Sequence, residues 1–86
     1  MSKDGEMFLN VGKLQAGEEH WAAAKAAARS ALDKGVKKPG GAWQVIGQSE
    51  KELGNKPAAL AAYREAAKYP ETRKWADASI KAAGAK

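Results

Sequence analysis

The apolar side chains of this chain recur with the period of an α-helix. A first stripe, spaced by three, four, three and one residues, is formed by Trp21, Ala24, Ala28, Ala31 and Leu32. A second stripe with similar spacing is formed by Leu60, Tyr63, Ala66 and Ala67. Residues three and four positions apart lie on the same face of a helix, so each stripe predicts a helix with one face to bury.

Glycine and proline divide this pattern into segments that each have the length of a helix. The breaks lie at Gly17, Gly35, Pro39-Gly40-Gly41, Gly54, Pro57, Pro70 and Gly84. We expect five helices, near residues 6–16, 18–34, 41–53, 57–69 and 71–83. Valine, isoleucine and threonine are too scarce to favour a sheet. The predicted fold class is therefore all-α.

Length and composition make this a single domain over residues 1–86. A chain of 86 residues with 44% apolar content has material for only one core. Its twenty alanines favour helix and let neighbouring helices approach closely. The break at residues 35–41 is the longest, but neither side of it has enough helices for its own core. We interpret this break as the connection between two stacked helix hairpins.

A short motif occurs twice in the chain, at an offset of 35 residues. Its two copies are Phe8-Leu9-Asn10-Val11-Gly12 and Trp43-Gln44-Val45-Ile46-Gly47. Each reads as an aromatic residue, two further residues, a β-branched aliphatic residue and a glycine. The large side chains would fill the space between paired helices, and the glycine would let the second helix of a pair press on the first.

Around the second copy, residues 42–70 resemble the tetratricopeptide signature W-x2-L-G, A-x3-F and a closing proline. The matching residues are Trp43, Ile46, Gly47, Gly54, Ala59, Tyr63, Ala66 and Pro70. Residues 8–34 match more weakly, through Phe8, Val11, Gly12, Ala24, Ala28 and Ala31. The resemblance implies two antiparallel helix hairpins of an α-α superhelix, with repeat 1 near residues 6–34 and repeat 2 near residues 41–69.

The segment near residues 71–83 is interpreted as a capping helix. Trp75, Ala78 and Ser79 echo the motif as though a third repeat had begun and stopped. Repeat arrays need a terminal element with one polar face. That face would be supplied by Arg73, Lys74, Asp77 and Lys81.

The resemblance also predicts how the repeats pack. Trp43, Ile46, Leu60 and Tyr63 should be buried together, Gly47 should sit against the following helix, and Trp75 should belong to the core. Two departures concern positions where the family usually has an aromatic residue. Gln15 and Glu50 stand at one such position in the two repeats, which should loosen that packing layer. Ala28 stands at another, where Trp21 would fill the space.

A second, weaker resemblance concerns the segments 35–40 and 71–76. They are similar to the C-terminal part of bacterial repeat proteins associated with Ton-type energy-transducing systems of the cell envelope. This resemblance implies a periplasmic fragment of a larger array. The residues alone leave both periplasm and cytoplasm open, because a chain without cysteine gives no sign of redox compartment.

Catalytic and metal chemistry finds little support in the sequence. The one histidine, His20, stands beside Glu18 and Glu19, but consecutive residues of a helix point in different directions. No cysteine, second histidine or nucleophile motif accompanies it. We therefore expect no enzyme activity, no cofactor, no metal site and no small-molecule substrate.

The resemblance implies a site for a protein or peptide partner on the concave face, formed by the first helix of each hairpin. The corresponding residues here are Leu9, Asn10, Lys13, Gln44, Val45 and Gln48. On a helical wheel Val45 lies roughly opposite Trp43, so its apolar side chain is expected to face the groove, and Leu9 likewise. Such a groove would suit an extended or helical segment with few charges.

The net charge of +5 is concentrated after residue 33, because residues 1–33 sum to −1 while residues 34–56 and 57–86 each sum to +3. Acidic residues interrupt the basic ones, so a solvated surface is favoured over a nucleic-acid site. No segment approaches the length of an apolar membrane span. A protein-interaction module is the favoured function, and the alternatives are the structural end of a longer repeat array and a basic RNA-binding helical domain.

Overall fold

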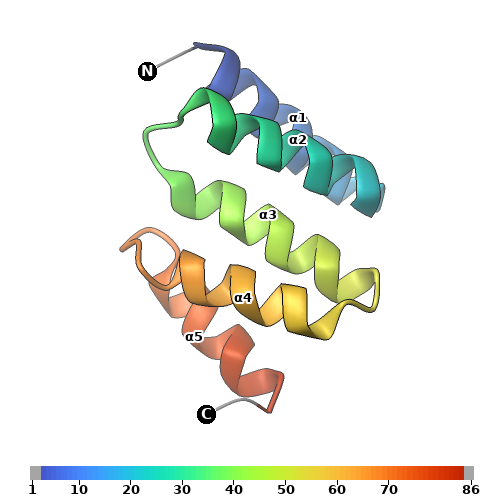
Figure 1. The fold of residues 1–86 in the computed structure, drawn as a ribbon, viewed down its shortest axis with the longest axis vertical. Coiled ribbons are helices and arrows are strands. Elements are labelled where there is room, and N and C mark those ends of the chain that lie inside the picture. Colours follow the sequence, from blue (N-terminus) through green and yellow to red (C-terminus); the bar gives the residue numbers. More distant parts are fainter. Residues whose placement is uncertain (1–2, 85–86) are drawn as a thin grey trace.

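The computed structural model describes residues 3–84 and consists of five α-helices over that range. They are α1 (Lys3–Gly17), α2 (Trp21–Lys34), α3 (Pro39–Glu52), α4 (Lys56–Ala66) and α5 (Arg73–Ala82). The helices follow one another along the longest axis of the molecule, from α1 at one end to α5 at the other (Figure 1). No strand occurs among these residues, so the predicted all-α class is confirmed. The predicted domain 1–86 extends past them, since residues 1–2 and 85–86 lie outside the described range.

The helix ends differ from the predicted ones by a few residues, for local reasons. α3 begins at Pro39, because proline lacks an amide hydrogen and the first turn of a helix does not use it. α4 ends at Ala66, and residues 67–72 form turns around Pro70 before α5 begins. Gly54, at φ 83°, adopts a left-handed conformation in the short turn between α3 and α4.

Consecutive helices pack side by side in two hairpins, α1 with α2 and α3 with α4. α2 also packs along α3, which joins the two hairpins through the connection at residues 35–38. α5 packs on α4 at the far end. The long break in the sequence is therefore a connection between stacked hairpins, as predicted.

The core is built mainly from small side chains. Its buried cluster consists of Leu9, Ala24, Ala28, Ala31, Val36, Ala42, Val45, Ile46 and Ala62. Five of these nine residues are alanine, so the helix backbones approach closely.

Gly47 marks the closest approach within the second hairpin. A Cβ atom on Gly47 would lie 2.8 Å from two ring carbons of Tyr63, which is closer than real Cβ contacts allow. The prediction that Gly47 sits against the following helix is confirmed. The corresponding Gly12 is also buried, and a Cβ there would lie 3.2 Å from the carbonyl oxygen of Ala24.

The expected cluster of large side chains is only partly buried. Ile46 and Tyr63 are buried, whereas Trp43 and Leu60 are half-buried. Trp43 packs against the core cluster from outside, because closely approaching alanine-rich helices leave no room to enclose an indole. The prediction that all four are buried together is wrong for these two residues, and Trp75, expected in the core, is half-buried too.

The position at which Glu50 was expected to loosen the packing is instead closed by polar contacts. The Glu50 side chain is 5% exposed, and its Oε1 accepts hydrogen bonds from Lys25 Nζ at 3.0 Å and Asn55 Nδ2 at 2.9 Å. Asn55 stands at the N-cap position of α4, yet its side chain makes this bond instead of capping the helix. Glu50 thereby ties α3 to α2 and to the turn before α4.

Burial by itself would raise the pKa of Glu50. The hydrogen bonds from Asn55 and Lys25, together with the positive charges of Lys25 and Arg29, outweigh it and hold the pKa below its ordinary value. Glu50 is therefore a carboxylate at neutral pH, and a charged group at this depth is stabilised by its partners.

Candidate functional site

Two hollows in the molecular surface are candidates for a binding site. The first, the α1–α3 groove, runs between the first helices of the two hairpins and encloses about 330 Å³. It is lined by Lys13, Ala16, Gly17, Gly41, Gln44, Val45 and Gln48. Four of the six residues predicted for the partner site are among them, namely Lys13, Gln44, Val45 and Gln48. The other two are Leu9, which lies beneath the groove in the core, and Asn10, which is exposed on α1 outside its lining.

The prediction that apolar side chains face the groove is confirmed for Val45, which lines it, and is wrong for Leu9, which does not. Neither side chain is free, however. Both side chains are only 5% exposed and belong to the core cluster. The wheel position opposite Trp43 is the side of α3 that faces α1, and contact between these two helices covers it. Val45 therefore forms part of the floor of the groove with Leu9 beneath it, and a partner would reach little of either.

The accessible part of the groove is polar. Lys13 and Gln48 are exposed and Gln44 is half-buried. Among the described residues, none of these three side chains makes a hydrogen bond or an ion pair. Gln44 and Gln48 are four positions apart on α3, so their carboxamides lie one turn from each other on the same face. The groove thus offers two amides and one ammonium group that have no partner within the described part of the chain.

Gly41 keeps this groove open. A Cβ atom on Gly41 would meet Leu9 Cδ2 at 3.6 Å, and Lys13 Cε and Nζ at 3.8 Å. The Lys13 ammonium group therefore lies close to the backbone of α3 at Gly41, in the hollow that Gln44 and Gln48 also line. A larger side chain at Gly41 would occupy the space between Lys13 and the floor.

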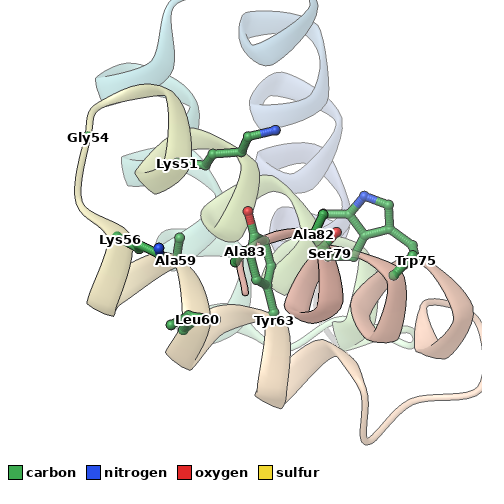
Figure 2. A pocket seen from close by; sticks show the side chains of 11 residues that line it. Lys51, Gly54, Lys56, Ala59, Leu60, Tyr63, Trp75, Ser79, Ala82 and Ala83 are labelled. Carbon is green, nitrogen blue, oxygen red and sulfur yellow. The ribbon is translucent and has the colours of Figure 1, made fainter. Parts of the chain in front are cut away.

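The second hollow, the α4–α5 cleft, encloses about 510 Å³ and was not predicted from the sequence. Figure 2 shows its walls, with Leu60 and Tyr63 on α4, Trp75 and Ser79 on α5, and Lys51 at the rim. The rings of Tyr63 and Trp75 meet edge to face, with centroids 5.3 Å apart and an interplanar angle of 84°. The partial third copy of the motif at Trp75 is the sequence signal that could have revealed this cleft. It corresponds to the first helix of a hairpin, and no second helix follows α5 within residues 3–84 to pack against it.

Tyr63 is the cleft residue whose pKa is shifted from its ordinary value. Burial raises the pKa of its phenol, and the nearby carboxylate of Glu52 raises it further. Tyr63 therefore stays neutral at physiological pH and serves the cleft as an aromatic wall with a hydroxyl group. Lys51 and Lys56 give the rim a positive charge, and neither has an ion-pair partner among the described residues.

Groups suited to catalysis or metal binding are sparse in the described part of the chain. His20 is exposed, and its Nδ1 lies 3.9 Å from Glu18 Oε1. Over residues 3–84, the acidic and histidine side chains form no cluster of three or more that could hold a metal ion. No helix within that range combines the length and the apolar character needed to cross a membrane.

Comparison of the chain with protein-family models, with curated proteins and with solved structures gave no match.

Proposed function

We propose that this protein is a polypeptide-binding module of the tetratricopeptide type and not an enzyme, and that its partner binds in the α1–α3 groove. The observation that carries the proposal is the set of unpartnered polar groups over an apolar floor, formed by Lys13, Gln44 and Gln48. The repeat of the motif at 35 residues and the stacked hairpins support the choice of family.

A polypeptide is the ligand that fits these groups. A carboxamide has both a donor and an acceptor, so Gln44 and Gln48 match the two hydrogen-bonding groups of a peptide unit. The Lys13 ammonium group adds a donor for a carbonyl oxygen of the ligand. A hollow of about 330 Å³ takes a few residues, and its floor of buried side chains favours small apolar groups between the polar contacts.

RNA binding has less support. Sequence-tolerant RNA recognition uses exposed aromatic rings on which bases stack. Trp21, Trp43 and Trp75 are all half-buried, and Trp75 is engaged with the ring of Tyr63. Within residues 3–84, Phe8 is the one exposed side chain among the phenylalanine, tyrosine and tryptophan residues, so successive bases would find no second exposed ring of this kind.

The test is selection of peptides on the purified domain from a displayed random library, followed by calorimetry with the enriched peptide. We expect the double variant Gln44→Ala and Gln48→Ala to bind that peptide about tenfold or more weakly, because two hydrogen bonds at about 1 kcal/mol each are removed. Its melting temperature should stay unchanged, since neither carboxamide has a hydrogen-bond partner within residues 3–84.

The matched control is the double variant Arg73→Ala and Asp77→Ala on α5. Both residues are exposed and, like Gln44 and Gln48, four positions apart, and their removal leaves the net charge unchanged. Its peptide affinity should equal that of the unmodified protein. Equal binding by the Gln44 and Gln48 variant would refute the groove assignment.

A further inference from the structure

The outer face of α1 carries apolar side chains whose repeat equivalents are covered in α3. Positions 35 residues apart pair Met7 with Ala42, Phe8 with Trp43, Val11 with Ile46 and Leu14 with Ser49. On α1 the exposed fractions are 60%, 37%, 40% and 64%, whereas Ala42 and Ser49 are at 0% and Ile46 is at 1%. We call Met7, Phe8, Val11 and Leu14 the α1 stripe.

The difference arises because α2 covers this side of α3. The core cluster joins Ala42 and Ile46 of α3 to the buried alanines of α2. No element within residues 3–84 covers the same side of α1, so the stripe is the surface that a first helix presents to the second helix of a neighbouring hairpin. Its spacing over two turns gives a continuous apolar band.

The complementary surface lies at the other end of the molecule. Leu60 of α4 stands 35 residues after Lys25 of α2, the residue that contacts Glu50 of α3. Leu60 is half-buried in the α4–α5 cleft, which α5 leaves open. By the same offset, the α4 residues that correspond to the buried alanines of α2 are Ala59, Tyr63 and Ala66, and these are already buried. The cleft therefore leaves accessible only the flank of this α4 surface around Leu60.

The charges near the two surfaces also favour contact between the α1 stripe and the α4–α5 cleft. In the α2–α3 contact, Lys25 near the start of α2 meets Glu50 near the end of α3. The cleft rim carries Lys56 at the start of α4 and Lys51 near the end of α3. The same antiparallel arrangement would set this rim beside the turn that follows an α1 helix, where Glu18 and Glu19 are exposed. The hairpin that carries the stripe is also the less basic half of the chain, since residues 1–33 sum to −1 and residues 34–86 to +6.

We propose that a second copy of this chain fills the cleft, with the α1 stripe of one copy packed into the α4–α5 cleft of the next. Like the α2–α3 interface, the contact would set a first helix against a second helix, here beside α5 instead of in its place. It goes beyond the peptide binding proposed above, because it uses neither Gln44 nor Gln48. Two different surfaces meet in it, and they lie at opposite ends of the fold (Figure 1). Such a head-to-tail contact adds copies in an open row.

The test is the weight-average mass in sedimentation equilibrium, measured from about 10 µM to about 1 mM, where a small interface is expected to associate. The unmodified protein should rise above the monomer mass as concentration increases. Two variants each remove one surface: Met7→Lys with Leu14→Lys removes the stripe, and Ala78→Lys places a charge in the cleft. All three positions are exposed, so circular dichroism should show both variants folded. Each alone should remain a monomer.

An equimolar mixture of the two variants decides the geometry. Each keeps the surface that the other lacks, so the mixture should reach the dimer mass and go no higher. The control Ala26→Lys, at an exposed position of α2, should associate like the unmodified protein. A protein that stays monomeric throughout overturns the proposal, and so does a mixture that forms no dimer. Association that survives in either variant alone would show a contact through other surfaces, which also refutes the head-to-tail assignment.

Discussion

The two repeats use equivalent positions in different ways, and the clearest case is the pair Gln15 and Glu50. Both stand at the same place in a first helix, 35 residues apart. The carboxylate of Glu50 is bound by Lys25 and Asn55, whereas the buried Oε1 of Gln15 has no hydrogen-bond partner among the described residues. Lys25, the charged partner of Glu50, comes from the preceding hairpin, and the first repeat has no such hairpin within residues 3–84.

Position 45 and its equivalent, position 10, show the same asymmetry on another face. Val45 is buried between helices, while Asn10 is exposed on α1. α3 lies in the middle of the stack and contacts α1, α2 and α4, whereas α1 contacts only α2 and α3 within residues 3–84. Neighbouring helices thus decide what a position of the repeat does, and three pairs of substitutions test this view.

The largest effect is expected from Val45→Glu compared with Asn10→Glu. A charge at position 45 would be buried without a partner, so we expect a loss of about 3 kcal/mol or more in the free energy of unfolding. Asn10→Glu should change it by less than about 0.5 kcal/mol, as at other exposed positions. Urea unfolding of both variants measures the difference. Similar losses for the two would show that the repeats are equally covered.

A smaller effect is expected from the two buried glycines. Gly47→Ala should cost about 1–3 kcal/mol, because its Cβ would collide with the ring of Tyr63. In Gly12→Ala the new Cβ would lie 3.2 Å from a backbone oxygen, so the neighbouring helix must move by a few tenths of an ångström. The higher helix propensity of alanine, worth about 1 kcal/mol, offsets the cost of that movement, and the stability of this variant should change little. Thermal melting should therefore separate the two variants. A Gly47→Ala protein as stable as the Gly12→Ala protein would remove our account of the second hairpin.

The smallest effect is expected on the loss of stability at low pH. The pKa of Glu50 is lower in the folded protein than in the unfolded chain, so its contribution to stability is complete above the unfolded value and is lost as pH falls through the folded value. The variant Glu50→Gln should lose less stability than the unmodified protein between neutral pH and about pH 3. Gln15→Ala serves as the control, and its loss of stability with acid should match that of the unmodified protein. Parallel curves for all three proteins would contradict the role given to Glu50.

The helices and their pairing could be predicted from local information. The spacing of Trp21, Ala24 and Ala28 fixes a helix face. The breaks around Pro39 and Pro70 separate consecutive helices, although the helix ends next to these prolines lie two to three residues from the predicted ones. The contact of Gly47 with the next helix also followed from the motif. All of these are properties of neighbouring residues or of one hairpin.

The candidate site was only partly predictable, because coverage depends on contacts between distant segments. A helical wheel shows which side of α3 holds Val45, but not that α1 covers that side. Lys25, the charged partner of Glu50, lies 25 residues away in sequence. The α4–α5 cleft depends on how α5 crosses α4 after the turn at Pro70, and the sequence pattern carries no measure of that angle.

The central claim, that a peptide binds between α1 and α3, is tested most directly by nuclear magnetic resonance. The selected peptide is titrated into labelled protein while the amide signals of Gly41, Gln44 and Gln48 and the indole signal of Trp75 are followed. Our account predicts that the backbone amide signals of these three groove residues and the side-chain amide signals of both glutamines shift with one common affinity. The Trp75 indole signal should stay in place. Shifts centred on Trp75, with the glutamine side chains unmoved, would place the peptide in the α4–α5 cleft and contradict the claim.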